Sequence, residues 1–341
     1  MARGRPSRST VYARLDRAIA DLRSRLGGLP SPKESETIWA DIWHVEAHHS
    51  TALEGNTLVL REVEALLAKG LAIGSKPLKE YMEVMGYGDA AAWVYGQALE
   101  PDEWSDGELI SLNEIRRIHR MAMGPVWGVA PHPDANEHEA PGDFRQHDIR
   151  PFDAGMTPPP WSDVPAQITD WVNDVVAVGR RIRDGEPPSA PLPEDLARLH
   201  NGFERVHPFL DGNGRSGRLA LNLILVRLGY PPVIVFKQQR SAYLAAMQKS
   251  DAGDHGPLGE LIARAMLDNL NRFIVPNVAG PARLVPLAAL ASQDFTVAAL
   301  RQAAQRGRLD AEQSADGIWR SSRKAVAAYE KNKHTRRPKS T

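Results

Sequence analysis

The sequence contains no cysteine among its 341 residues. Disulfide cross-links and thiolate zinc sites are therefore excluded, and a reducing cytoplasm is the default expectation. Long apolar runs are absent too. The basic N-terminal stretch MARGRPSRSTVYARL lacks the apolar segment of a signal peptide, and the most apolar segment, LALNLILVRLGY, is interrupted by Asn222 and Arg227. We therefore expect neither export nor a membrane span.

An overall excess of charge is also missing, because 42 basic and 42 acidic side chains cancel. The balance is uneven along the chain, however. Residues 282–341 carry 12 Lys/Arg against 5 Asp/Glu, which leaves 30 against 37 in the rest. A C-terminal segment of charge +7 is thus joined to a body of charge −7.

Strand signals are few, whereas helical periodicity is frequent. In LARLHNGFERV the apolar residues Leu196, Leu199, Phe203 and Val206 recur at three- and four-residue steps. Such spacing predicts a helix with one buried face. The stretch GDFRQHDIRPFDAGMTPPP, bounded by glycines and prolines, instead favours a short hairpin or an extended loop. The sequence therefore predicts a mainly α-helical fold with a short β-hairpin.

Two stretches rich in turn-forming residues divide the chain, which at 341 residues is long enough for two or three domains. VPNVAGPARLVP, residues 275–286, separates the last amphipathic helix from the basic segment. LEPDEWSDGEL, residues 99–109, marks a softer boundary. We predict an N-terminal helical region at residues 1–105, a helical core domain at 106–276 and a small module at 282–341.

The stretch HPFLDGNGRSGR, residues 207–218, concentrates chemically active side chains directly after an amphipathic helix. Gly212 and Gly214 permit close approach of the backbone to a ligand, and the apolar spacing after them predicts that they open a helix. Amide groups and the helix dipole at such a terminus attract an anion. Arg215 and Arg218 share the same helix face and need an anionic partner, which a polyphosphate would supply.

Two further residues add chemistry to this anion site. No Gly-Lys-Ser/Thr follows the glycines, so the stretch is not a Walker loop. Asp211 is a hard oxygen ligand of the kind that Mg²⁺ uses together with substrate phosphates. His207 has an ordinary pKa of about 6.5, which suits a general base near neutral pH. Base, metal ligand, amide cradle and guanidinium groups together indicate phosphoryl or nucleotidyl transfer.

These residues resemble the signature of Fic-domain proteins, His-Pro-Phe-x-Asp-Gly-Asn-Gly-Arg-x-x-Arg, at every specified position. The resemblance extends over the surrounding helices, roughly residues 40–275. It implies a helical Fic core that transfers AMP from ATP to a hydroxyl side chain of a target protein. It also implies that His207 deprotonates the attacking hydroxyl and that Asp211 holds Mg²⁺.

The same resemblance implies how the phosphates are bound. Gly212, Asn213 and Gly214 would cradle the α- and β-phosphates. Arg215 and Arg218 would contact the β- and γ-phosphates.

The extended stretch GDFRQHDIRPF resembles the flap of these proteins, which clamps the target beside the α-phosphate. Within it, Phe144 and Arg145 are the candidates for ligand contact, and ordinary hairpin packing is the alternative. Tyr243, in RSAYLAAM, stands where the family often lines the adenine site. A tyrosine of the core is equally compatible with the sequence at that position.

A second motif lies earlier in the chain, in HHSTALEGNTL. Ser50 and Glu54 are four residues apart, hence on one face of a helix that Gly55 can end. Fic proteins often carry an inhibitory helix of the form Ser/Thr-x-x-x-Glu-Gly/Asn, and these three residues match it. The resemblance implies that Glu54 pairs with Arg218 and occupies the place of the γ-phosphate, so that the isolated enzyme is autoinhibited.

A zinc site is the alternative interpretation of this helix, because His44 and His48 lie at i, i+4 spacing. The glutamate between them is Glu46, at the third position, whereas a zinc-protease helix needs it at the second. No third ligand is evident, so we expect no zinc here.

The basic C-terminal segment has the pattern of a small helical module. Thr296 can cap a helix that runs through Gln305 and stops at Gly307, ADG indicates a hairpin turn, and Ser322 can cap a final helix. This order resembles the winged helix-turn-helix of excisionase-like and MerR-like DNA-binding proteins. The basic candidates for DNA contact are Arg301, Arg306, Arg308 and Arg320. A module for protein contacts or dimerisation, giving a homodimer, is the alternative.

Three functional hypotheses follow. The first is an autoinhibited protein adenylyltransferase that uses ATP and Mg²⁺. The second is a DNA-binding regulator whose Fic body senses nucleotide. The intact His207 and Asp211 favour the first, because a sensor needs a phosphate cradle but no base. The third keeps the fold but transfers another phosphate-containing group, or removes AMP.

Overall fold

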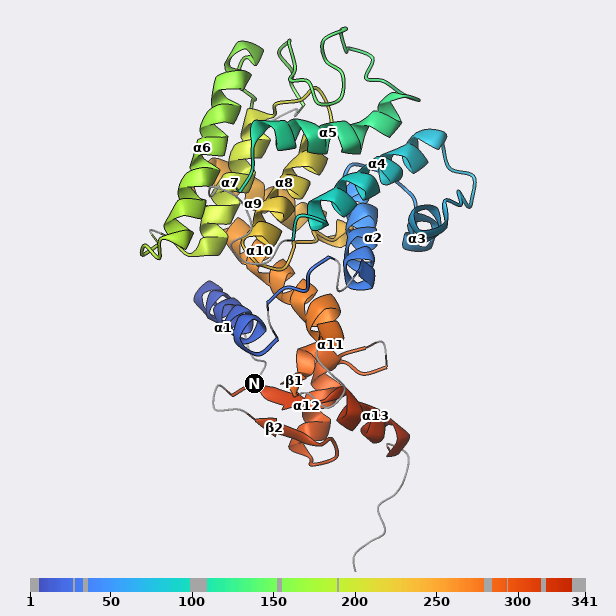
Figure 1. Ribbon diagram of the computed structural model, residues 1–341, viewed down its shortest axis with the longest axis vertical. Coiled ribbons are helices and arrows are strands. Elements are labelled where there is room, and N and C mark those ends of the chain that lie inside the picture. The colour runs from blue at the N-terminus through green and yellow to red at the C-terminus, as the bar shows by residue number, and fades with distance from the viewer. Residues whose placement is uncertain are drawn as a thin grey trace, which may run out of the picture.

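The computed structural model describes residues 6–26, 28–32, 36–98, 109–151, 155–188, 190–278, 284–292, 294–313 and 317–332. Helices dominate, which confirms the mainly α-helical fold predicted from the sequence (Figure 1). The first eight described α-helices are α1 (Arg8–Leu26), α2 (Glu36–Leu53), α3 (Leu60–Lys69), α4 (Leu78–Tyr95), α5 (Leu112–Trp127), α6 (Val164–Arg183), α7 (Leu192–Val206) and α8 (Asn213–Arg227). The remaining ones are α9 (Arg240–Asp251), α10 (Gly256–Asn269), α11 (Val275–Val278), α12 (Val297–Gln305) and α13 (Arg323–Asn332).

Short elements complete the description. Short 3-10 helices are η2 (Trp161–Asp163), η3 (Lys237–Gln239) and η5 (Leu287–Leu290), and η4 (Leu270–Ile274) is a π-helical turn. The strands are β1 (Val285–Pro286), β2 (Ala311–Gln313) and β3 (Trp319–Ser321). Among the helices described, none has both the length and the apolar character that crossing a membrane requires.

Helix α8 lies at the centre of the helical body (Figure 1). Its residues from Arg215 to Val226 are all buried, and it contacts α4, α5 and α7. A helix surrounded on every side needs apolar residues all round, and LALNLILV supplies them. This burial fixes the N-terminus of α8, where the predicted phosphate cradle begins.

Helix α7 presents the apolar face that its periodicity predicts. Leu196, Leu199, Phe203 and Val206 are buried, and the helix contacts α6, α8 and α10. Trp171 of α6 packs edge-on against Phe203, with ring centroids 5.3 Å apart. Since α7 and α8 pack against each other and are joined by a short loop, the C-terminus of α7 lies beside the N-terminus of α8.

The expected flap, residues 142–151, consists of turns and extended backbone, and the strands of the described chain lie in the C-terminal segment instead. Its backbone groups are bonded elsewhere. Arg145 N donates to the carbonyl of Pro208 (3.0 Å), and Gln146 N donates to Glu139 Oε1 (2.6 Å). These partners replace a hairpin ladder, so the extended-loop interpretation applies here.

The caps predicted for the C-terminal segment are present. Thr296 Oγ1 accepts from Ala299 N (3.2 Å), and the helix α12 that follows ends at Gln305 as expected. Ser322 Oγ accepts from Ala325 N (3.1 Å) at the start of α13. These side chains satisfy amide groups that a helix cannot satisfy itself.

The three strands form one antiparallel sheet in the order β1-β3-β2. Val285 pairs with Ser321, and Glu312 pairs with Arg320. The predicted hairpin turn, ADG, falls mostly outside the described residues. Strands β2 and β3 therefore pair as the sequence predicts, and β1 adds to the free edge of β3.

Arg320 differs from the expectation. Its side chain is only 4% exposed, and Nη2 lies 2.8 Å from Asp21 Oδ2 on α1. A buried guanidinium bonded to another helix is not free to contact DNA, so Arg320 is removed from the candidates. The side chains of Arg301, Arg306 and Arg308 are exposed.

Candidate active site

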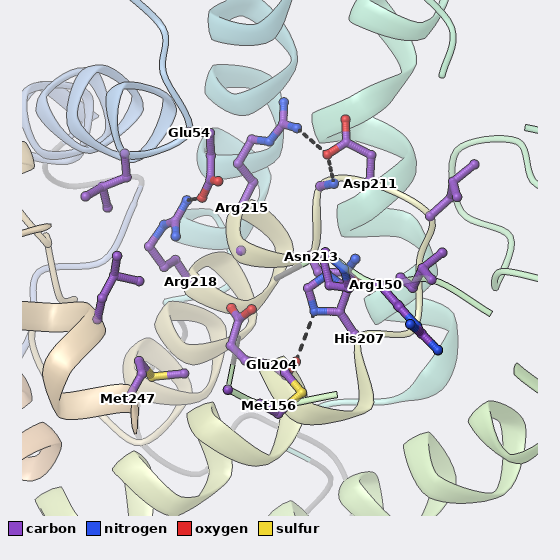
Figure 2. A pocket seen from close by; sticks show the side chains of 18 of the residues that line it. Glu54, Arg150, Met156, Glu204, His207, Asp211, Asn213, Arg215, Arg218 and Met247 are labelled. Atoms are coloured by element: carbon purple, nitrogen blue, oxygen red, sulfur yellow. Dashed lines mark hydrogen bonds and ion pairs between the residues drawn. The ribbon is translucent and has the colours of Figure 1, made fainter. Parts of the chain in front are cut away.

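A cavity of about 950 Å³ opens where the end of α7 meets the start of α8. The end of α2, residues 147–151 of the flap and helix α9 also line it, together with His132, Asp134, Gly155 and Met156 (Figure 2). The structure brings together in this wall the predicted site residues Glu54, His207, Asp211, Gly212, Asn213, Gly214, Arg215, Arg218 and Tyr243. The predicted residues Ser50, Gly55, Phe144 and Arg145 are not part of the lining.

His207 follows α7 with a left-handed backbone, at φ 48° and ψ 59°. Its Nδ1 lies 3.1 Å from the carbonyl oxygen of Glu204. Because a carbonyl only accepts, Nδ1 carries the proton and Nε2 is the basic nitrogen. Burial lowers the pKa of His207 to about 4, and the charge of Arg145 lowers it further while the bond to Glu204 opposes this. The imidazole is therefore neutral near pH 7 and able to accept a proton.

Arg145 holds His207 in this conformation from the flap. Its side chain is 1% exposed, and Nε donates to the carbonyl of His207 (2.9 Å). The other two nitrogens donate to the carbonyls of His147 (3.2 Å) and Pro159 (2.6 Å). The guanidinium is thus occupied by main-chain oxygens. Arg145 therefore positions His207 and does not line the cavity as a ligand contact would.

Phe144 also packs inside the protein. Its ring lies 5.6 Å from that of Phe209, and the Arg116 guanidinium lies 5.2 Å from its centroid. The packing alternative therefore describes Phe144, because its neighbours leave it outside the cavity. The flap residues that do line the cavity are His147, Asp148, Ile149, Arg150 and Pro151.

His119 on α5 supports the site and was not predicted from the sequence. Its ring stacks on Phe209 with centroids 3.7 Å apart. Nδ1 accepts from Gly142 N (2.7 Å), so Nε2 carries the proton and donates to the carbonyl of Asp211 (2.9 Å). Burial lowers the pKa of His119 to about 4, which keeps this one-donor, one-acceptor form. The only sequence signal was a histidine on the apolar face of an amphipathic helix.

The loop between α7 and α8 is closed by Asn213. Its Oδ1 accepts from Phe209 N (2.9 Å), and its Nδ2 donates to the carbonyl of Phe209 (2.7 Å). Gly212 precedes α8 at φ 78°, and a Cβ there would lie 2.5 Å from Met123 Sδ. The first amide groups of an α-helix have no acceptor within the helix. Here they border the cavity and form an anion site.

Asp211 and Arg215 form an ion pair beside this cradle. Asp211 Oδ1 accepts from Arg215 Nη2 (3.2 Å) and from Gly212 N (2.5 Å). Burial raises the pKa of Asp211, but the Arg215 charge, the bond from Gly212 N and nearby histidines together outweigh burial, so the pKa lies below its ordinary value. The Asp211 side chain is 46% exposed. Within the described residues no three His, Cys, Asp or Glu side chains are arranged to hold a metal ion, so a cation at Asp211 would need further oxygens from a ligand.

The predicted pair of Ser50, on α2, and Glu54, just after α2, binds Arg218. Arg218 Nη2 donates to Glu54 Oε1 (2.7 Å), and Nε donates to Ser50 Oγ (2.7 Å). Burial lowers the pKa of Arg218, but negative neighbours, Glu54 first, raise it above its ordinary value. Burial likewise raises the pKa of Glu54, and Arg218 outweighs it so that the pKa is lowered. Both groups are therefore charged at neutral pH.

The Glu54 carboxylate also covers the N-terminus of α8. A Cβ on Gly214 would lie 2.6 Å from Glu54 Oε1, so the carboxylate contacts the first turn of that helix. Gly55 then turns the chain away at φ 102°, a conformation that favours glycine. Glu54 thus occupies an anion position at a helix N-terminus.

Helix α9 brings apolar side chains to the cavity. Its Leu244 and Met247 line the cavity with Met156, beside the polar Arg240, Gln248 and Asp251 of the same helix. Tyr243 of α9 is buried, with its hydroxyl 2.7 Å from His200 Nε2. The cavity therefore offers charged groups at α8, an end with apolar side chains at α9 and a neutral imidazole. A ligand with both phosphates and an aromatic base fits this division.

Comparison with known proteins agrees with the signature. The model of the Fic/DOC family matches residues 109–225. The chain is 31% identical over 276 residues to protein adenylyltransferase fic-1 of Caenorhabditis elegans, covering 80% of this chain and 49% of that protein. It is 28% identical over 267 residues to protein adenylyltransferase Fic of Drosophila willistoni, covering 76% and 48%. The chain thus spans about half the length of these relatives.

Solved structures are similar as well. Fic-1 from C. elegans matches with a TM-score of 0.59 and 26% identity, over 78% of this chain and 72% of that one. A Fic family protein from Desulfovibrio desulfuricans G20 matches in fold with a TM-score of 0.54 and 20% identity, over 94% and 97%. The complete signature, the matched family model and these similarities agree, and the chain carries a Fic domain of the Fic/DOC family at residues 109–225.

Proposed function

We propose that this protein is a protein adenylyltransferase, which transfers AMP from ATP to a hydroxyl side chain of a target protein. One observation carries the proposal: a neutral His207, whose Nδ1 donates to the carbonyl of Glu204, lines the cavity beside the N-terminus of α8. The names of the relatives in C. elegans and D. willistoni support the same activity.

In the proposed reaction, His207 Nε2 takes the proton of the target hydroxyl while the hydroxyl oxygen attacks the α-phosphorus of ATP. A new O–P bond forms to AMP, the bond to the bridging oxygen breaks, and pyrophosphate leaves. The Nδ1 bond to the carbonyl of Glu204 keeps Nε2 unprotonated before the attack. The first amide groups of α8 and Arg215 would stabilise the charge on the phosphate oxygens.

Asp211 would hold Mg²⁺ in this reaction. The Asp211 carboxylate fits the ion, because a charged, half-exposed carboxylate beside a phosphate site is the usual protein contribution to Mg²⁺ binding. When bound, the ion neutralises phosphate charge. Arg215 and the amide of Gly212 hold the Asp211 carboxylate in place.

Autoinhibition by Glu54 is part of the proposal. Its carboxylate contacts the first turn of α8 and pairs with Arg218, so a γ-phosphate would compete for the same partners. If this competition cost about 3 kcal/mol, productive ATP occupancy would fall on the order of a hundredfold. We further assign the adenine to the apolar end beside Tyr243, and keep the domain bounds 1–105, 106–276 and 282–341.

The experiment that tests this function uses ATP labelled on the α-phosphate, Mg²⁺ and a cell lysate. Glu54→Gly should label target proteins strongly, the unaltered protein weakly, and Glu54→Gly/His207→Ala not at all. Glu54→Gly/His138→Ala, which removes an exposed histidine, is the matched control and should label like Glu54→Gly. Labelling that survives loss of His207, or no labelling after Glu54 is replaced, would contradict the proposal.

A second candidate function is DNA binding by the C-terminal segment. The helix α12, the antiparallel strands β2 and β3 that follow it, and the exposed Arg301, Arg306 and Arg308 support this proposal. We expect the full chain to shift a DNA duplex at low salt and release it at high salt, because phosphate contacts weaken steeply with salt. Without a salt-sensitive shift, protein contact or homodimer formation is the function left for this segment, and sedimentation measures the dimer.

A further inference from the structure

Glu204 is a buried carboxyl group at the cavity that no part of the proposed reaction uses. It lies on α7, three residues before His207, is 9% exposed and lines the cavity. Its Oε1 has no hydrogen-bond partner, and no other carboxylate oxygen in the described chain is both buried and unpartnered. By contrast, buried Glu46 accepts bonds from Tyr87 and Asn222. A buried acceptor without a donor is unfavourable, so a ligand that supplies one gains affinity.

None of the residues that the structure describes donates a hydrogen bond to Glu204 Oε1. Burial raises the pKa of Glu204 to about 7, the charge of Arg218 lowers it and Glu54 raises it. Arg218 directs its Nε and Nη2 to Ser50 and Glu54 and not to Glu204. On the other side, a Cβ on Gly217 would lie 2.3 Å from Glu204 Oε1. The carboxyl group therefore rests directly on the backbone of α8, in space that exists only because residue 217 is glycine.

The position of Glu204 indicates which part of a nucleotide it meets. Figure 2 shows the Glu204 carboxyl group between Arg218 and His207, with Met247 and Met156 below it. Phosphates belong at the charged end and an aromatic base at the apolar end. The sugar of the nucleotide connects the two and passes Glu204.

We propose that Glu204 is a specificity-determining residue that accepts hydrogen bonds from the 2′- and 3′-hydroxyls of the nucleotide's ribose. The proposal rests on the nucleotide-binding function proposed above. Its chemistry excludes the other parts of the ligand as partners, because a carboxylate repels phosphate oxygens and the base lies toward α9. Two neighbouring hydroxyls offer two donors, which match the two oxygens of one carboxylate. A sugar without these hydroxyls leaves the buried group unpaired, the situation in which a polar site discriminates most strongly.

Calorimetric titration of the full-length Glu54→Gly protein tests this. The ligands are ATP and 2′,3′-dideoxy-ATP, each with Mg²⁺. We expect ATP to bind at least about tenfold more tightly. In Glu54→Gly/Glu204→Gln the preference should fall to about twofold, chiefly through weaker ATP binding. Glu54→Gly/Glu186→Gln, which removes an exposed carboxylate outside the cavity, is the matched control and should keep the tenfold preference.

Gly217→Ala in the same background provides a second variant that leaves Glu204 itself in place. The added methyl group displaces the carboxyl group, so the preference for ATP should fall here too. Thermal unfolding of each variant checks that it is folded.

The possible failures are distinguishable. Equal affinity for ATP and dideoxy-ATP in the Glu54→Gly protein would overturn the ribose assignment. This measurement needs no Glu204 variant, and such a result would leave the proposed AMP transfer intact. A preference that persists in folded Glu54→Gly/Glu204→Gln would overturn the role of Glu204. No binding of either nucleotide would overturn this inference together with the proposed function.

Discussion

At the residue scale, two side chains from other segments hold the loop between α7 and α8. His119 Nε2 donates to the carbonyl of Asp211, and Arg145 Nε donates to the carbonyl of His207. Both bonds go to the main chain of the residues proposed as metal ligand and as base. His119 and Arg145 therefore position these two residues without lining the cavity themselves.

Arg145 is open to a direct test in the Glu54→Gly background. Arg145→Met should lower the rate of AMP transfer tenfold to a hundredfold, on the order expected when a reacting group is misplaced by about an ångström. The pH dependence should change as well. The Arg145 charge lowers the pKa of His207, so its loss raises that pKa. Because the base acts in its neutral form, the acid limb of the rate profile should move to higher pH.

Arg180→Met is the matched control, since it removes an exposed arginine on α6. Its rate and pH profile should equal those of the parent. An Arg145→Met protein with the parent's rate and acid limb would refute the positioning role.

The sequence predicts only part of this arrangement. His207, Asp211 and the glycines are neighbours in the chain, so a local pattern of loop and helix start is enough to bring them together. His119 and Arg145 act through main-chain carbonyls of that loop from other segments. No spacing rule predicts such contacts, because a carbonyl is present at every position.

At the element scale, α2 is fixed at its middle and ends at the site. Glu46 accepts from Tyr87 Oη of α4 (2.7 Å), from Tyr95 Oη and from Asn222 Nδ2 of α8 (2.8 Å). The helix that carries Ser50 is therefore bonded to both of its neighbours. Glu54 lies just beyond its last turn, before Gly55. Relief of the proposed inhibition by Glu54 thus requires movement of the end of α2 and not of the whole helix.

Glu46 also makes stability depend on pH. Burial raises its pKa from 4.5 to about 7, and its hydrogen bonds oppose that shift. The folded state then keeps a proton that the unfolded state loses near pH 4.5, so stability falls as the pH rises from about 4.5 to about 7. Glu46→Gln removes this loss. The stability of the variant relative to the parent should therefore rise by about 2 kcal/mol between pH 5 and pH 8.

Urea unfolding at the two pH values measures this difference. Contributions of the histidines are the same in both proteins and cancel. Glu186→Gln, an exposed glutamate, should show no pH-dependent difference from the parent. A constant difference for Glu46→Gln between pH 5 and pH 8 would show that Glu46 ionises normally in the folded state.

Prediction from sequence also has a limit at the element scale. Helices such as α7 and α12 follow from apolar spacing and caps, which are local. The flap does not, because its backbone bonds go to Pro208 and to the Glu139 side chain. A hairpin and an extended loop share the same glycine and proline signals, and the long-range partners decide between them.

At the scale of the whole molecule, the basic C-terminal segment is joined to the helical body by charge. Arg320 of β3 is bonded to Asp21 of α1, which lies 299 residues earlier in the sequence. The excess charge of the segment therefore cannot be treated as one free surface. Sequence composition reveals the excess but not which arginines are already paired, and only the exposed ones remain candidates for DNA.

The cavity is likewise a property of the whole molecule. Its charged end needs α2 as well as α8, since Glu54 and Arg218 come from opposite parts of the chain. Its apolar end needs α9, and its rim needs the flap. We propose that this arrangement moves AMP, rather than another part of ATP, onto a protein, and that Glu54 limits the reaction.

The most direct test compares two positions of the label. Glu54→Gly is incubated with lysate, Mg²⁺ and ATP labelled on either the α- or the γ-phosphate, beside the unaltered protein. We predict protein-bound label from α-labelled ATP only, at a level far above that of the unaltered protein. Protein-bound label from γ-labelled ATP would show phosphoryl transfer and contradict the claim, as would α-label that Glu54→Gly does not increase.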